Sequence, residues 1–255
     1  LRWTEHWRVR SSGSVRMAIV EVRNILVIAA EHSELSGLLR HLGKVERLRW
    51  PLDYAVVGER SGERWWLLAN GAGRALAGGA ADAAHGKQQF DSVLSIGLCG
   101  GVDPALSAGE VVVASEILDI AGAKRLAGTR PATDRAFACG CLATVDCVIR
   151  TTSDKARIRA MGAVAVDMEA AAVAGRAAGW GIPFYCVRAV SDTADEAIQL
   201  DLNACRSKSG RICGMRVLGA AMHNPRRLLP ELIHLWRRSR QAADALGDFL
   251  ADCRF

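Results

Sequence analysis

Two carboxylates follow buried-strand patterns in the second half of the chain. Ser191 and Asp192 come directly after the run 184–190, which is apolar apart from Arg188. Glu169 lies between the short apolar run 163–166 and an alanine-rich helical pattern. In an open α/β sheet, ligands bind beyond the carboxyl ends of the strands. We therefore expect Asp192 and its neighbour Ser191 to face a ligand. Two carboxylates at neighbouring strand ends can act differently on one ligand, because the surroundings set the protonation of each.

The junction that carries Asp167, Met168 and Glu169 also has a purely structural interpretation. In this interpretation Asp167 caps the helix that follows, and Glu169 complements its dipole. The local sequence leaves both interpretations open. The second junction carboxylate, Asp192, favours the ligand site.

Two glycine-rich junctions also follow strand patterns. The first is Asn70-Gly-Ala-Gly73-Arg74, where Leu76 stands in place of the third glycine of a dinucleotide fingerprint, so a Rossmann cofactor site is not expected. The second is Gly97-Leu-Cys-Gly-Gly101, and glycine there lets a flat ligand approach the backbone at Cys99 and Gly100. A tight strand-to-helix turn remains the alternative for both.

Strand and helix patterns alternate along the chain. Strands are predicted at 25–30, 65–69, 92–96, 111–115, 163–166 and 184–190, and helices at 33–42, 74–85, 153–161, 168–178 and twice near the C-terminus. This order predicts a three-layer α/β/α fold with a central, largely parallel, twisted sheet, and leaves mixed pairing open at one edge. We expect a flexible N-terminal extension at 1–16 and a single domain over 17–255 that ends in a basic helical segment, 206–255.

The composition fits one large core and free thiols. Half of the 255 residues are hydrophobic, which is enough to bury a single core. The eight cysteines are scattered, with no C-x-x-C pair and no zinc-ligand spacing, so we expect free thiols in a reducing cytoplasm and no metal or redox site. No apolar run reaches the roughly 18 residues of a membrane span.

The positive charge is concentrated near the two ends of the chain. The net charge is +6, yet the segment 206–240 alone carries nine basic residues against one acid. A nucleic-acid partner is not expected, because no basic motif interleaved with aromatic residues is present. The amphipathic pattern 228–250 predicts a helix, either packed on the domain or in peripheral contact with anionic lipid at the inner membrane face.

Three motifs resemble the signatures of the nucleoside phosphorylase and nucleosidase superfamily. They occur in the expected order at 95–113, 166–170 and 187–195. The resemblance is closest to methylthioadenosine/adenosylhomocysteine nucleosidases, while the tail from Asp201 resembles the hopanoid-associated phosphorylase branch. It implies an enzyme that cleaves a purine from a ribonucleoside, a small-molecule substrate, a homodimer or larger oligomer, and no metal or organic cofactor.

The resemblance also assigns roles to individual residues. Asp192 matches the acid that protonates purine N7, which requires a buried and protonated carboxyl group. Glu169 matches the carboxylate that binds the ribose 2′- and 3′-hydroxyls, and Met168 matches the residue packed on the sugar. Glu34 matches the glutamate that activates the attacking water. Without the resemblance, Glu34 would be an exposed first-turn acid with Glu31 as a nearby rival.

The segment Asp146-Cys-Val-Ile149 matches the part of the family that binds the purine. In the family, its backbone reads the purine edge and an aromatic side chain stacks on the base. Here Val148 stands in place of the aromatic residue and Ile149 follows it. We therefore expect looser stacking of the base, or stacking by another residue.

The sequence indicates less clearly whether water or phosphate is the nucleophile than which residue protonates the purine leaving group. Phosphorolytic relatives hold phosphate with arginines and a serine or threonine near the glycine turn, where this chain has Leu98 and Cys99. Arg74 beside Gly73 is the candidate for a phosphate co-substrate, or else a solvated helix-start arginine. We favour hydrolysis of an adenine nucleoside with a 5′-substituent. The alternatives are phosphorolysis of an adenosyl-lipid and a non-catalytic nucleoside-binding module.

Overall fold

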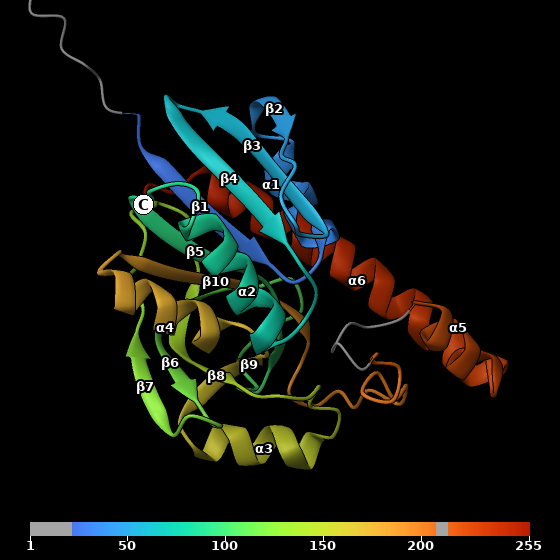
Figure 1. Cartoon of the computed structure of the whole chain (residues 1–255). Coiled ribbons are helices and arrows are strands. Elements are labelled where there is room, and N and C mark those ends of the chain that lie inside the picture. The colour runs from blue at the N-terminus through green and yellow to red at the C-terminus, as the bar shows by residue number, and fades with distance from the viewer. Residues whose placement is uncertain (1–21, 208–213) are drawn as a thin grey trace, which may run out of the picture.

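Over residues 22–207 and 214–255, ten strands form one mixed sheet that is covered by helices on both faces (Figure 1). The computed structural model describes residues 22–207 and 214–255. The extension predicted at 1–16 and the domain start at Met17 lie outside the described residues. The predicted three-layer α/β/α class is confirmed.

The parallel centre of the sheet contains the predicted apolar strands. β1 (Asn24–Ala29) lies between β4 (Glu63–Ala69) and β5 (Ser92–Gly101), and β10 (Phe184–Asp192) pairs with the other edge of β5. The β1 side chains alternate between two cores: Leu26 and Ile28 belong to one, and the flanking residues belong to the other. Burial on both faces accounts for the continuous apolar runs of these strands.

Five strands pair in a closed ring, so antiparallel pairing reaches well beyond one edge of the sheet. β10 is antiparallel to β6 (Val111–Asp119), which continues in parallel through β8 (Ala138–Thr144) to β9 (Ala163–Asp167), and β9 returns antiparallel to β5. Gly100 of β5 is paired with Val166 on one side and with Asp192 on the other. The curl of the sheet thus places the ends of β9 and β10 on either side of one glycine.

Four strands were absent from the sequence prediction. β3 (Tyr54–Arg60) and β2 (Gly43–Arg47) add antiparallel strands beyond β4, and β7 (Lys124–Ala127) pairs with β6. β2 is exposed along its whole length and β7 along most of it, so neither shows an apolar period. The fourth, β8, consists largely of alanine, glycine and cysteine, whose small side chains give a weak strand signal.

The helices cover opposite faces of the sheet. α2 (Arg74–His85) and α4 (Ala170–Trp180) pack together on one face through buried alanines, and α3 (Thr152–Ala160) lies at the end of the ring (Figure 1). Their bounds agree with the predicted helices to within two residues. The helix predicted at 33–42 is wrong in extent, because the 3₁₀ turn η1 (His32–Leu35) precedes a single turn, α1 (Ser36–Leu39).

The C-terminal segment forms α5 (Gly214–Met222) and α6 (Pro225–Ala251). The second half of α6 packs on the sheet face opposite α2 and α4, where Leu246 and Leu250 are fully buried. The first half of α6 and α5 extend away from the sheet (Figure 1). Over the described residues, no helix is both long and apolar enough to cross a bilayer.

Candidate active site

A cavity of about 300 Å³ opens at the carboxyl ends of β1, β5, β9 and β10. It brings together nine of the predicted site residues: Glu34, Cys99, Gly100, Val148, Ile149, Met168, Glu169, Ser191 and Asp192. These residues are spread over 159 positions of sequence, from 34 to 192. The placement agrees with the rule that open α/β sheets bind ligands beyond the strand ends.

Asp192 ends β10 and is buried, as predicted, with 7% of its surface exposed. Its Oδ1 accepts a hydrogen bond from Ser191 Oγ at 2.6 Å. Its Oδ2 accepts one from the ammonium group of Lys155 at 2.5 Å. Gly100 leaves the space for this carboxylate, because a Cβ there would lie 3.3 Å from Asp192 Oδ2.

Lys155 was not found by sequence analysis, although it is almost completely buried at 1% exposure. It lies on α3, in the run 154–160, where charged residues are interspersed with alanine and isoleucine. Lysine is rarely buried, so a lysine in such a run predicts a solvated side chain. Only the fold shows that its ammonium group reaches the end of β10.

Glu169 lies at the start of α4 and points toward the glycine turn after β4. Its Oε1 accepts a hydrogen bond from the Gly73 backbone N–H at 2.6 Å, and its Oε2 accepts one from Met168 N–H. Burial raises the pKa of Glu169 to about 7, and the negative charge of Asp167 adds to this shift, while Arg188 opposes it. The carboxylate is therefore poised near neutral pH.

Asp167 takes the structural role that the local sequence allowed. Its Oδ2 accepts the Ala170 N–H at the start of α4 and forms a buried ion pair with Arg188 at 2.6 Å. Its Oδ1 accepts the Thr144 hydroxyl at 2.6 Å. Arg188 also donates to Ser95 Oγ. Asp167 also lines the cavity, and this network accounts for Arg188, the charged residue within the apolar part of β10.

Glu34 is buried, so the interpretation as an exposed first-turn acid is wrong. Its carboxylate accepts three backbone N–H groups, those of Ala30, Glu31 and Leu98, at 2.9 to 3.0 Å. Burial raises its pKa, and these hydrogen bonds oppose the shift. Gly97 is required beside it, because its φ is +144° and a Cβ would lie 2.7 Å from Glu34 Oε1. The rival Glu31 is exposed and caps η1.

The candidate phosphate residues, Gly73 and Arg74, do not line the cavity. The Arg74 guanidinium forms ion pairs with Asp119 at 2.7 Å and with Asp146 at 2.6 Å, and it also donates to the Thr144 carbonyl. The Gly73 N–H is bound by Glu169. The structure therefore gives no support to a phosphate site at this pair, because neighbouring groups already occupy both residues.

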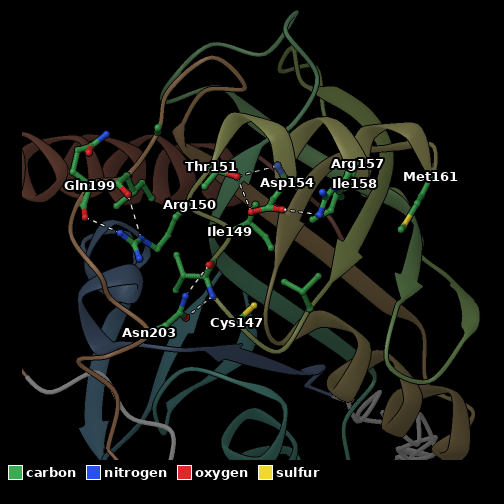
Figure 2. A pocket seen from close by; sticks show the side chains of 14 residues that line it. Cys147, Ile149, Arg150, Thr151, Asp154, Arg157, Ile158, Met161, Gln199 and Asn203 are labelled. Carbon is green, nitrogen blue, oxygen red and sulfur yellow. Dashed lines mark hydrogen bonds and ion pairs between the residues drawn. The ribbon is translucent and has the colours of Figure 1, made fainter.

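The predicted purine segment forms a wall between two cavities. Val148 and Ile149 line the first cavity and also a second one of about 660 Å³ on the α3 side (Figure 2). The Asn203 side chain fixes the Val148 backbone, with one hydrogen bond to its N–H and one to its carbonyl. Among the described residues, no aromatic side chain lines the first cavity. The described residues also include no cluster of three metal-binding side chains.

Comparison with known proteins agrees with the geometry. Residues 24–215 match the family model described as the phosphorylase superfamily. A 5′-methylthioadenosine/S-adenosylhomocysteine nucleosidase of Marinomonas sp. is 30% identical over 54% of this chain and 72% of its own length. The Chromohalobacter salexigens enzyme of the same name is 26% identical over 77% and 95%.

The solved structures show the same fold. The Neisseria meningitidis 5′-methylthioadenosine/S-adenosylhomocysteine nucleosidase, crystallised with methylthio-immucillin-A, superposes with a TM-score of 0.69. It is 21% identical, and the match covers 91% of this chain and 98% of the other. With the family model spanning most of the sequence, the resemblance predicted from the three motifs is confirmed: the chain belongs to the phosphorylase superfamily.

Proposed function

We propose that the protein hydrolyses the N-ribosidic bond of an adenine nucleoside that carries a 5′-substituent. The observation that supports this most strongly is the convergence of Glu34, Glu169 and Asp192 on one cavity from three different strand ends. Cleavage of this bond leaves positive charge on the ribose and negative charge on the purine. A site with separately placed carboxylates can act on both partners at once.

Asp192 is the proposed acid for the purine. Its Oδ1 lies toward Ser191 at the cavity wall, and Gly100 beside it allows a flat base to approach the backbone. A carboxyl group that protonates N7 turns the departing purine into a neutral leaving group. Val148, Ile149 and Leu98 supply apolar surface for the base in place of an aromatic ring.

Glu169 is the proposed ligand of the ribose hydroxyls. Its carboxylate is held by two backbone N–H groups, so its orientation is fixed before the substrate binds. When ionised, it accepts hydrogen bonds from two adjacent hydroxyls and also stabilises the positive charge that develops on the sugar. Met168, which lines the cavity next to it, offers a soft apolar surface to the ribose.

Glu34 supports hydrolysis over phosphorolysis. The N–H groups of Ala30, Glu31 and Leu98 converge as in an anion-binding site, and the Glu34 carboxylate itself occupies it. A phosphate dianion at the same place would be repelled by this carboxylate, whereas a water molecule could donate a proton to it. Arg74, the candidate counter-charge for phosphate, is already paired with two aspartates.

Adenine release in the presence and absence of inorganic phosphate tests this proposal. Hydrolysis predicts equal rates and a free reducing sugar as the product. Strict dependence on phosphate with formation of a ribose 1-phosphate would instead establish phosphorolysis. No release from any adenine nucleoside would leave the nucleoside-binding module as the better description.

The 5′-substituent is proposed to lie at the apolar end of the cavity. Leu202 and Ile198 line it from the loop after β10, and α6 contributes Leu235 and Ser239. A thioether or an alkyl chain suits such a lining better than a charged group. The relatives named above act on methylthioadenosine and adenosylhomocysteine, so these two compounds head the substrate panel, followed by an adenosine with a long 5′-alkyl chain.

We also propose that α5 and the first half of α6 contact an anionic membrane surface, which favours a lipid-bearing 5′-substituent as the second candidate. Met215 on α5 is 79% exposed and Trp236 on α6 is 57% exposed. The exposed arginines Arg226, Arg227, Arg237 and Arg240 lie on the same helix as Trp236. Exposed apolar side chains among cations are suited to the interface of a bilayer with negative head groups.

Co-sedimentation with vesicles tests this contact. We expect binding of the full chain to phosphatidylglycerol vesicles at low salt and little binding to phosphatidylcholine vesicles. The double variant Ile233→Ser/Trp236→Ser should lose the binding, while Val45→Ser, an exposed apolar residue on β2, should retain it. Equal retention by both variants would argue against the contact. The homo-oligomer stays a prediction, which light scattering can measure.

A further inference from the structure

Lys155 is a buried cation that contacts the three-carboxylate site through Asp192. Its ammonium group has three donors, and three acceptors surround it: Asp192 Oδ2 at 2.5 Å, the Thr193 carbonyl, and the Glu196 carbonyl at 3.0 Å. Burial of a lysine is costly unless its charge is paired and its donors are satisfied. Here Asp192 and the two carbonyls satisfy all three donors, and Asp192 also pairs the charge whenever it is ionised.

The ammonium group makes the two oxygens of Asp192 different. Oδ2 is an acceptor held by Lys155, so a proton on Asp192 belongs on Oδ1, which lies 2.6 Å from Ser191 Oγ. The Ser191 hydroxyl has one proton and two acceptors within reach, Asp192 Oδ1 and the Cys99 carbonyl at 3.1 Å. When it donates to Cys99, its oxygen can accept from a protonated Oδ1.

We propose that Lys155 is a positioning residue for proton transfer to the purine, an inference that rests on the proposed function. It holds Asp192 by Oδ2, leaves Oδ1 to carry the proton, and stabilises the carboxylate that forms when this proton leaves. In the step, the Oδ1–H bond breaks and an N–H bond forms on the purine. The electron pair of the C1′–N bond goes to the purine, and water adds to C1′ and gives a proton to Glu34.

The charge of Lys155 becomes useful as the reaction proceeds. In the proposed step, Asp192 is a neutral carboxyl group until its proton leaves and a carboxylate afterwards. The ion pair is therefore complete only when the proton has moved, so its stabilisation is greater in the transition state than in the ground state. Within a buried site such an interaction needs little reorganisation, because Thr193 and Glu196 hold the ammonium group in place.

Lys155→Met and Lys155→Gln test this role with two substrates. One is 5′-methylthioadenosine, whose adenine needs a proton to leave. The other is p-nitrophenyl ribofuranoside, whose p-nitrophenolate leaves as a stable anion. We expect Lys155→Met to lower kcat on the adenine nucleoside by about a hundredfold or more, with KM changed little, and to lower kcat/KM on the p-nitrophenyl substrate by less than about fivefold. Lys155→Gln keeps hydrogen-bond donors but no charge, so its kcat on the adenine nucleoside should lie between those of the wild type and Lys155→Met.

Arg159→Met is the matched control, since Arg159 lies on the same helix and its side chain is 55% exposed. It should leave both substrates unaffected. Equal losses of Lys155→Met on the two substrates would show a merely structural role and overturn the inference, as would an unchanged rate on the adenine nucleoside. Failure of the wild-type enzyme to release adenine would count against the proposed function instead.

A second measurement covers the case in which Lys155→Met does not fold. The double variant Lys155→Met/Asp192→Asn removes both charges and leaves no unpaired ion in the interior. If Lys155 acts through Asp192, the double variant should be no slower on the adenine nucleoside than Asp192→Asn alone. A further loss of tenfold or more would show that Lys155 acts independently of Asp192, and would overturn the inference.

Discussion

The aspartates that end β9 and β10, the strands on either side of β5, both lie within hydrogen-bonding distance of a buried cation, yet only Asp192 is available to a ligand. Asp167 of β9 pairs with Arg188, and its side chain has no exposure; Asp192 of β10 pairs with Lys155, and its side chain is 9% exposed. The oxygens of Asp167 accept from Arg188, Thr144 and Ala170, all parts of the protein. Asp192 keeps one oxygen at the cavity, next to a hydroxyl that can reorient.

This difference separates a carboxylate that supports the fold from one that can react. Both have a cation at hydrogen-bonding distance and both lie at a strand end, so neither burial nor charge pairing distinguishes them. What distinguishes the two aspartates is whether a carboxylate oxygen still has hydrogen-bonding capacity left for a ligand. Variants at Asp192 should therefore act mainly on activity, whereas variants at Asp167 and its partners should act mainly on stability.

The largest effect is expected for Asp192→Asn. The amide keeps the shape but cannot supply a proton, so kcat for adenine release should fall by about 10²- to 10⁴-fold. The amide oxygen can still accept from Lys155, but the negative charge beside this buried ammonium group is lost, so some thermal stability should be lost as well. Turnover assays and thermal denaturation of the same preparation measure the two quantities. A nucleoside-binding module would show unchanged ligand affinity and no turnover in either form.

Arg188→Leu should have the largest effect on stability. It leaves the Asp167 carboxylate buried without its cation, which costs about 3 to 5 kcal/mol of the free energy of unfolding. Urea denaturation measures this loss. The double variant Arg188→Leu/Asp167→Asn removes the uncompensated charge and should recover part of it. If Arg188→Leu were as stable as wild type, the structural role of this pair would be wrong.

Sequence analysis found the residues with a pattern of their own and missed those defined by the fold. Asp192 and Glu169 follow apolar strands, and Gly97–Gly101 is an unusual cluster of glycines, so each is visible locally. The contact of Lys155 with Asp192 forms only because α3 packs at the end of the ring, since the two residues are 37 positions apart in sequence. Arg74 looked free for phosphate because its partners, Asp119 and Asp146, are 45 and 72 residues distant.

The same reasoning explains which strands were predicted. Strands buried on both faces, such as β1 and β10, are continuous apolar runs and are easily identified. β2 gains its conformation from pairing with β3 and buries no side chain, so its sequence carries no period. The closed ring likewise depends on the long-range pairing of β9 with β5, which only two residue pairs make.

The pH dependence of activity tests the proposed part of Glu169. Its pKa is raised to about 7 by burial and by Asp167, so below that pH it loses the charge that its proposed role as ligand of the ribose hydroxyls needs. We expect kcat/KM to fall about tenfold per pH unit below 7. Because the folded state binds this proton more tightly than the unfolded state, the stability contributed by Glu169 decreases as pH rises from about 4.5 to 7.

Glu169→Gln isolates this contribution. The variant should have low activity without the acid limb, and its stability should depend less on pH over the same range. Glu34, whose pKa burial also raises, remains in the variant and provides the baseline. An acid limb that persisted unchanged in Glu169→Gln would assign the titration to another group.

The smallest effects are expected from the hydroxyl partners of the two aspartates. Thr144→Val removes the donor to Asp167 Oδ1 and also the acceptor of the Ala171 N–H, so it should cost about 1.5 to 3 kcal/mol of stability. Ser191→Ala removes the donor to Asp192 Oδ1 at a cavity wall that water can reach, so stability should change by less than about 1 kcal/mol. Its kcat should nonetheless fall by about tenfold, because Oδ1 loses the group that orients its proton. Loss of stability in Ser191→Ala without loss of kcat would reverse the assignment and make Asp192, like Asp167, a residue of the fold.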